Sequence, residues 1–263
     1  MLEITRKRGP FLLKEIWFSP RPYVVTGFDK VIFKNCEEPV DLDGFRRENF
    51  ATLAIDLTLD LDTIWKNMSS YCRRDVKRAE RRGVTVRLSE DFDAFYSIYS
   101  SFKEKKKLRW YFPMNKAEFT KYVRNGVLFA TEFHNRMIAG HVWFHDEHQM
   151  RGIVTASRRL ESNSELGSIV GCGNRLSIWR AIEYAKNSGM GILDLGGFYV
   201  GSDQNDPRYS INQFKLRFGG KLKRVYHYYY YSRMLSIVRP VQRLQFHLQN
   251  VFDAGPCEKK SIY

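Results

Sequence analysis

The sequence lacks the features of secreted, metal-stabilised and membrane-spanning proteins. Its four cysteines are far apart and form no Cys-x-x-Cys pair of the kind that binds zinc or carries redox chemistry. We expect them to be reduced thiols of a cytosolic protein. The segment 1–10 is charged and has no apolar signal-peptide core, and no apolar run reaches the roughly 18 residues of a membrane-spanning helix. The chain is therefore predicted to be neither secreted nor membrane-spanning.

Motifs of covalent and metal catalysis are missing as well. The sequence has no G-x-S-x-G elbow, no Walker phosphate loop, no H-E-x-x-H pair and no cysteine beside a candidate base. The histidines His141, His145 and His148 would need a further convergent ligand to hold zinc, so we predict no metal and no tightly bound cofactor. Positioning and electrostatics remain, and they suit direct acyl transfer to an amine.

Positive charge is abundant. Lysine and arginine number 43 against 29 aspartates and glutamates, which gives a formal net charge of +14. This excess predicts an anionic partner, which is a nucleotide or coenzyme phosphate, an RNA backbone or an anionic membrane surface. Residues 226–251 mix aromatic, aliphatic and arginine side chains and are predicted either to pack as a terminal helix or to lie in a bilayer interface. We expect a cytoplasmic protein, with peripheral contact at the inner face of the membrane as an open alternative.

The first third of the chain changes from strand-like to helical periodicity. Runs of β-branched and aromatic residues predict strands at 15–19, 23–28, 30–34 and 51–57. From Asp62 to Gly83 apolar residues recur every three or four positions, which predicts one amphipathic helix. The opposite face of this helix carries cations, which we predict to bind phosphate; a solvated face is the alternative. The cations are Arg73, Arg74, Lys77, Arg78, Arg81 and Arg82, interrupted by Asp75 and Glu80.

Helices and strands follow one another in an α/β order after Gly83. The predicted elements are strand 84–88, helices 91–105 and 115–124, strands 127–133, 137–145 and 149–157, helix 174–187, strand 191–195, helix 209–216 and strand 221–231. This order predicts a single α/β sandwich rather than two separate βαβ halves. Gly171 and Gly173 come directly before the helix predicted from Asn174, where free backbone N–H groups would bind a pyrophosphate. A tight turn is the alternative for these glycines.

Two further segments could carry chemistry. An apolar strand ends at Asp194, and Gly196 and Gly197 follow at the sheet edge where α/β proteins bind ligands. Asp194 is predicted to act as a base or to orient the donor, or alternatively to accept hydrogen bonds from loop N–H groups. Lys215 and Arg217 precede a Gly-Gly turn, where a fixed cation would stabilise an oxyanion or a phosphate. The alternative is a basic helix end that complements the helix dipole.

Three segments, Ile64–Val84, Asn174–Gly197 and Phe214–Gly220, resemble the GNAT acyltransferases and in particular their FemABX-like branch, the peptidyltransferases that build peptidoglycan bridges. The resemblance implies a mixed sheet flanked by helices. It implies a reduced GNAT-like half with a basic linker helix at 1–82, packed on a complete GNAT-like domain at 83–235, with a helical tail at 236–263.

The resemblance also implies an activity. An acyl group would pass from aminoacyl-tRNA or acyl-CoA, by direct attack in a ternary complex, to an amine of a lipid-linked or nucleotide-linked cell-envelope or glycan precursor. Lys215 would lie near the reacting ester, and the expected donor-binding residues are Gly171, Gly173, Asn174, Gly196, Gly197 and Arg217. The cations favour tRNA and the glycine loop favours coenzyme A. A non-catalytic RNA- or membrane-binding module and a small-molecule N-acetyltransferase are the alternatives.

Overall fold

The computed structural model describes residues 1–106, 114–161 and 164–237, and its contacts divide the chain into two compact units. One unit contains residues 1–4 and 49–225, and the other contains residues 5–48 together with the chain from residue 226 onward. These limits differ from the boundaries expected at residues 82 and 235, so the domain assignment stays a prediction. The tail expected at 236–263, including most of the stretch considered for membrane contact, lies from residue 238 outside the described residues.

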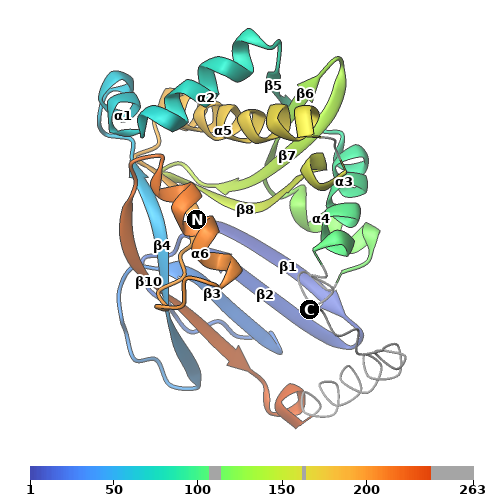
Figure 1. The fold of residues 1–263 in the computed structure, drawn as a ribbon. Coiled ribbons are helices and arrows are strands. Elements are labelled where there is room, and N and C mark those ends of the chain that lie inside the picture. Colours follow the sequence, from blue (N-terminus) through green and yellow to red (C-terminus); the bar gives the residue numbers. More distant parts are fainter. Residues whose placement is uncertain (107–113, 162–163, 238–263) are drawn as a thin grey trace, which may run out of the picture. The chain divides into compact units, whose positions relative to one another are not determined.

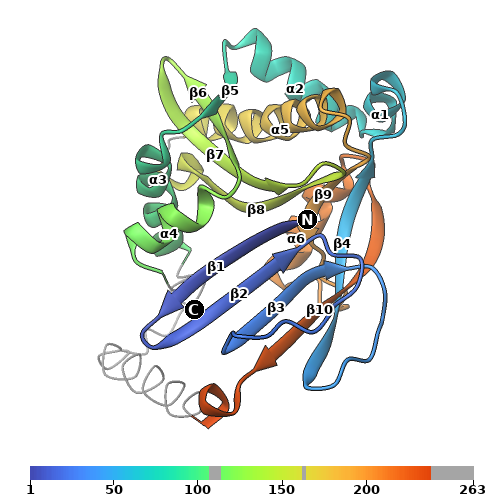
Figure 2. The same cartoon turned by 180° about the vertical axis from the view of Figure 1, so that it is seen from behind.

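The smaller unit joins two segments that are far apart in the sequence, residues 5–48 and the chain from residue 226, through strand pairing. Strands β1 (Leu2–Arg8), β2 (Phe11–Trp17), β3 (Lys30–Cys36) and β10 (Lys221–Tyr231) are neighbours in that order (Figure 2). β2 and β3 run parallel, and Phe33 of β3 pairs with Tyr228 of the antiparallel β10. Both rings are buried in the small core of this unit.

One of the predicted strands is absent from this unit. Residues 23–28 form a loop rather than a strand. Gly27 adopts φ +81°, which a strand does not use, and Pro20 and Pro22 just before it have no N–H to donate to a ladder. The prediction is wrong because the β-branched and aromatic residues of this segment favour a strand, whereas the glycine and prolines around them impose a loop.

The larger unit is built on a mixed sheet, as predicted. Its strands lie in the order β4 (Phe45–Asp56), β9 (Ile192–Gly197), β8 (Gln149–Ser157), β7 (Arg136–His145), β6 (Val127–Phe133) and β5 (Thr85–Ser89). β8 and β9 run parallel, and the other neighbouring pairs are antiparallel. Figure 1 shows this sheet with its helices, and it confirms the predicted α/β class.

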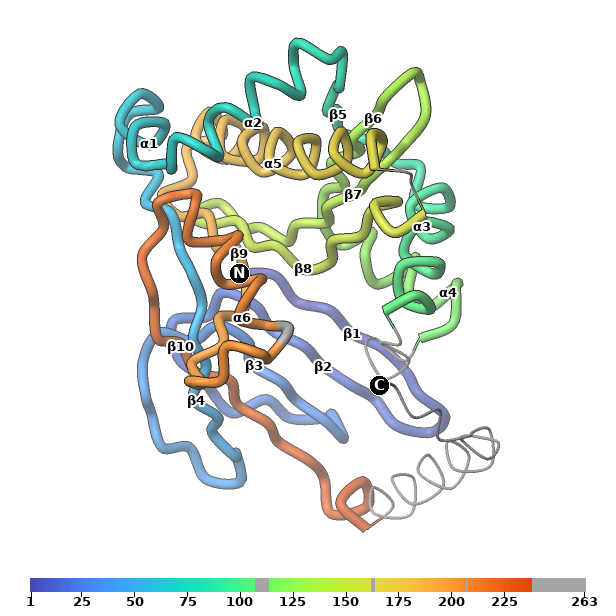
Figure 3. Tube along the Cα trace, viewed as in Figure 1, coloured from blue at the N-terminus to red at the C-terminus, as the bar shows by residue number. Residues whose placement is uncertain are grey.

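Helices cover both faces of the larger sheet. On β7, the side chain of His141 contacts Asn174 of α5 (Ser164–Asn187). A Cβ atom on the neighbouring Gly140 would meet the Phe95 ring of α3 (Phe92–Lys105) at 2.3 Å. Because adjacent strand residues point to opposite faces, α5 and α3 lie on opposite sides. α2 (Ser70–Arg81) runs beside α5, and α4 (Lys116–Val123) packs on α3 (Figure 3).

The helix predicted from Asp62 to Gly83 is two helices, α1 (Leu61–Asn67) and α2. Each has its own N-cap, because Asp60 accepts from the Thr63 N–H at 2.8 Å and Ser69 accepts from the Cys72 N–H at 3.2 Å. The apolar stripe continues across the break, so periodicity alone did not reveal it. Within the described ranges no helix is both long and apolar enough to cross a membrane.

Candidate active site

Lys215 lies in the last turn of α6 (Pro207–Leu216), whose first turn is capped by Asp206. Its ammonium group is partly buried and donates a hydrogen bond to the Gly197 carbonyl at 2.6 Å. Burial and the neighbouring Arg151 lower the pKa of Lys215 to about 8, and Asp194 acts in the opposite direction. The lysine is therefore a cation fixed beside the end of β9 at neutral pH, and it loses its proton as the pH rises through about 8.

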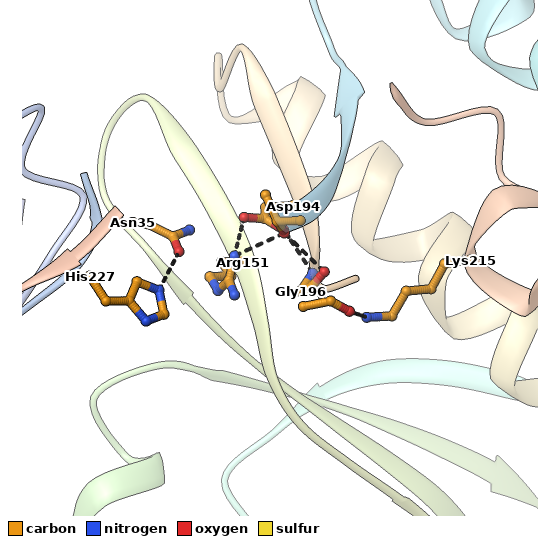
Figure 4. Close-up of polar contacts among 8 residues, drawn as sticks. Asn35, Arg151, Asp194, Gly196, Lys215 and His227 are labelled. Atoms are coloured by element: carbon orange, nitrogen blue, oxygen red, sulfur yellow. Dashed lines mark hydrogen bonds and ion pairs between the residues drawn. The ribbon is translucent and has the colours of Figure 1, made fainter. Parts of the chain in front are cut away.

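Asp194 is bonded within the protein on several sides (Figure 4). Its buried carboxylate contacts the hydroxyl of Thr52 and the guanidinium of Arg151, and accepts the Gly196 N–H at 2.7 Å. Both oxygens of this carboxylate are therefore engaged by donors within the protein. Asp194 therefore accepts a backbone N–H from the end of β9, and its predicted role as a base or in orienting the donor stays a prediction.

The last two residues of β9, Gly196 and Gly197, bring a carbonyl to Lys215; they belong to the strand, which was expected to end at residue 195. Gly196 adopts φ +85°, in the left-handed region that favours glycine, and its carbonyl lies 2.9 Å from the Thr52 hydroxyl. A Cβ on Gly197 would meet the Phe50 ring at 2.9 Å. Both glycines are therefore required for backbone shape and close packing. Their predicted contact with a donor stays a prediction.

The predicted pyrophosphate loop is wrong. Gly171, Gly173 and Asn174 lie inside α5, which begins at Ser164, and their backbone N–H groups belong to the middle of a helix. The Gly171 carbonyl accepts from Arg175 at 2.8 Å, and the Asn174 side chain lies 3.3 Å from His141. No free N–H groups remain there to hold a phosphate.

Burial lowers the pKa of His141 to about 4, so this histidine is neutral in the core.

The cationic face of α2 lacks one predicted cation, Arg73, and one predicted acidic residue, Asp75. Arg73 turns away to donate to the last carbonyls around α1, Lys66 O at 2.8 Å and Met68 O at 2.5 Å. Arg73 therefore binds backbone carbonyls at the C-terminal end of α1. Asp75 is buried against Arg175 and is not on this face. The exposed cations that remain are Arg74, Lys77, Arg78, Arg81 and Arg82, of which Arg82 pairs with Glu165 at 3.4 Å.

Two hollows are present in the larger unit. One of about 510 Å³ follows α2 and is lined by Ser70, Arg73, Arg74, Lys77, Glu80 and Arg81. The other, of about 870 Å³, lies where β4, β9 and the start of β10 meet α1, and no predicted catalytic, donor-binding or phosphate-binding residue lines it. Residues placed by the structure show no cluster of three or more metal-ligating side chains.

Several residues of the site were not singled out from the sequence. Arg151 and Thr52 lie within predicted strands, and the one usable signal was the charge of Arg151 in a strand with no other charged residue. Tyr71 and Arg175 likewise resembled ordinary members of their helices. Arg217, which was predicted, follows α6 and lies over the Tyr71 ring at 4.6 Å.

The mixed sheet with its flanking helices is the fold of the acyltransferase class to which the matching family model belongs. The chain belongs to the Acetyltransferase (GNAT) domain family, whose model matches residues 66–209, more than half of the chain. Comparison with curated proteins found no match.

Three solved structures share the fold at low sequence identity. FemX has a TM-score of 0.61 at 14% identity, covering 92% of this chain and 85% of its own. The C-terminal domain of a candidate lysylphosphatidylglycerol synthetase from Agrobacterium fabrum has 0.55 at 11% identity, covering 86% and 79%. L-PGS from Bacillus licheniformis has 0.51 at 12% identity, covering 90% and 82%.

Proposed function

We propose that this chain transfers an acyl group from an activated ester to an amine, with the Lys215 ammonium as the electrostatic catalyst. The observation that carries the proposal is the fixed position of this cation, bonded to Gly197 at 2.6 Å and surrounded by the Arg151–Asp194 network. A preorganised cation stabilises the negative charge that develops on the carbonyl oxygen in the transition state. Family membership supports acyl transfer as the class of reaction.

The reaction needs few groups from the protein. The neutral amine nitrogen attacks the acyl carbon and forms the C–N bond, the C–O or C–S bond to the donor breaks, and the departing oxygen or sulfur takes up the proton that the amine loses. Lys215 stays protonated throughout and supplies charge rather than a proton. This scheme gives Asp194 no role as a base, since its carboxylate is engaged in hydrogen bonds within the protein.

We infer aminoacyl-tRNA as the donor. The sequence argument for coenzyme A rested on Gly171 and Gly173, which lie inside a helix. The argument for RNA rests on exposed cations along α2, such as Arg74 and Lys77, beside a hollow of about 510 Å³. The name of the Agrobacterium fabrum neighbour, a candidate lysylphosphatidylglycerol synthetase, also denotes an aminoacylated product.

Acyl-CoA is the second candidate donor, because GNAT domains use acyl-CoA as co-substrate. The acceptor is proposed to be an amine of a lipid-linked or nucleotide-linked cell-envelope precursor, supported by the likeness in fold to FemX. The net charge of +14 suits phosphates on either kind of precursor.

Ligand-induced thermal stabilisation tests the donor. The protein is heated with bulk tRNA, with acetyl-CoA and with free coenzyme A, since a ligand at 100 times its Kd adds about 2.7 kcal/mol to stability. We expect stabilisation by tRNA that disappears at high salt. Stabilisation by the coenzymes alone would make acyl-CoA the donor, and no stabilisation by any of them would overturn both assignments. In a transfer reaction Lys215→Ala is expected to lower turnover about 10²-fold with the fold retained.

A further inference from the structure

Three guanidinium groups surround the ring of Tyr71. Arg217 lies 4.6 Å from the ring centroid, Arg175 lies 5.2 Å from it and Arg74 lies 5.4 Å from it. They come from three different parts of the chain, namely the end of α6, the middle of α5 and the first turns of α2. The Ser69 N–H donates to the Arg217 carbonyl at 2.8 Å, which fastens the end of α6 to the start of α2.

Among the described residues, one of these three charges, that of Arg175, has a carboxylate partner. Arg175 is buried, lies 3.4 Å from the Asp75 carboxylate and donates to the Gly171 carbonyl at 2.8 Å. Arg74 and Arg217 are exposed, and in the part of the chain that the structure describes neither has a carboxylate within 4.0 Å. Two like charges held at one ring repel each other, so an anion placed between them would be bound favourably.

The geometry also suits a phosphate in particular. A guanidinium carries a fork of N–H donors that matches two phosphate oxygens, and its cation is also attracted to the face of an aromatic ring. Tyr71 itself is 42% exposed, so its hydroxyl can reach the same ligand as a further donor. The hollow along α2, which Arg74 lines with Lys77, continues the positive surface away from this point.

We propose that Arg74, Tyr71 and Arg217 form a phosphate-binding clamp for the nucleotide part of the acyl donor. The proposal rests on the proposed function, because Arg217 follows Lys215 by two residues and so links the clamp to the reacting end of the donor. The bound group is a phosphate ester. In aminoacyl-tRNA it is a backbone phosphodiester of the acceptor end, and in acyl-CoA it is a phosphate of the coenzyme.

The test measures binding rather than transfer. Fluorescence anisotropy gives the Kd of labelled tRNA, and competition gives the Kd of coenzyme A and of inorganic pyrophosphate, for the wild type, for the double variant Arg74→Gln/Arg217→Gln and for Arg136→Gln. Arg136 is an exposed arginine at the start of β7, and Arg136→Gln controls for the loss of one charge; its change in log Kd is therefore doubled before it is compared with that of the double variant. Circular dichroism and thermal melting check that each variant folds.

We expect the double variant to bind tRNA at least about 10-fold more weakly than wild type, with a salt dependence reduced by about two phosphate contacts. Arg136→Gln should bind as wild type. Arg217→Lys keeps the positive charge but loses the paired N–H donors of the guanidinium, so its affinity for tRNA is expected to lie between those of wild type and the double variant. Loss of coenzyme A binding instead of tRNA binding would support the clamp and assign it to the coenzyme.

Other outcomes overturn the clamp. Unchanged affinity of the folded double variant for tRNA and for coenzyme A would refute it, and so would a change in log Kd no larger than twice that of Arg136→Gln. The proposed reaction would then still stand if Lys215→Ala abolished transfer. Failure of the wild type to bind either donor would remove the clamp and the proposed donors together.

Discussion

The pKa of Lys215 is the quantity on which the proposed mechanism depends most directly. A lysine ordinarily titrates at 10.5, and here burial beside Arg151 lowers the pKa to about 8. The difference corresponds to about 3 kcal/mol against the charged form in the folded protein. Because the mechanism needs the charged form, the catalytic cation is expected to be lost about tenfold for every pH unit above about 8.

Competitive acetylation measures this pKa without any substrate. The folded protein is pulsed with trace acetic anhydride from about pH 6 to about pH 11, and the labelled peptides are quantified by mass spectrometry. We expect Lys215 to reach half of its maximal reactivity near pH 8, about two units below the ordinary value for lysine. The exposed Lys121 of α4 in the same digest provides the reference curve.

The same pKa should appear in the reaction rate. Below about pH 8 log kcat/KM is expected to rise with slope one as the acceptor amine loses its proton. Above about pH 8 the loss of charge from Lys215 cancels this rise, so the profile bends. In Lys215→Arg the cation persists at all these pH values, and the rise should continue to the acceptor's own pKa.

Two results would refute this reasoning. Lys215 could label in parallel with Lys121, which would mean that its charge is not destabilised by its surroundings. Alternatively, the bend near pH 8 could survive in Lys215→Arg, which would assign it to another group.

Three further expectations follow from the same contacts. In urea unfolding, the free energy of unfolding of wild type should rise by about 3 kcal/mol relative to that of Lys215→Met between about pH 8 and about pH 10.5. The reason is that in this range the side chain of Lys215 is protonated in the unfolded chain and deprotonated in the folded one. A difference between the two proteins that does not change with pH would contradict the lowered pKa. Asp194→Asn should lower the free energy of unfolding by about 3–5 kcal/mol, since it leaves the Arg151 guanidinium buried without its carboxylate, and a loss below about 1 kcal/mol would argue against the network. Gly171→Ala should raise the free energy of unfolding by about 0.5–1 kcal/mol and leave donor binding unchanged, because a Cβ there meets nothing closer than 3.9 Å, whereas lost donor binding would restore the loop interpretation.

The sequence predicted most of the fold because most elements have simple periodicity. The strands of β6, β7 and β8 and the helices α3 and α4 were found close to their true limits. The start of α5 could not be predicted because glycines usually mark the ends of helices, whereas Gly171 and Gly173 lie inside this one and Gly173 serves close packing. A Cβ on Gly173 would lie 3.0 Å from Thr131 of the sheet, so a small residue lets the helix approach closely.

The candidate site was predicted in part. Lys215 could be singled out because a charged residue close to a Gly-Gly pair is unusual, and Gly196 and Gly197 because two glycines follow an apolar strand. The partners of Asp194 could not be predicted, because Arg151 and Thr52 are 43 and 142 residues away in sequence and only the sheet order brings them together. Periodicity predicts which face a residue occupies, and it does not identify the neighbouring strand.

The buried ion pair of Arg151 and Asp194 also has a consequence for strand alignment. These two residues are partners in the parallel pairing of β8 with β9. A slip of one position would set Arg151 beside Leu193 or Leu195, and two buried charges would lose their partners at a cost of several kcal/mol. The pair therefore favours one register of β8 against β9 over its neighbours. In this register the Gly197 carbonyl lies where Lys215 donates a hydrogen bond to it.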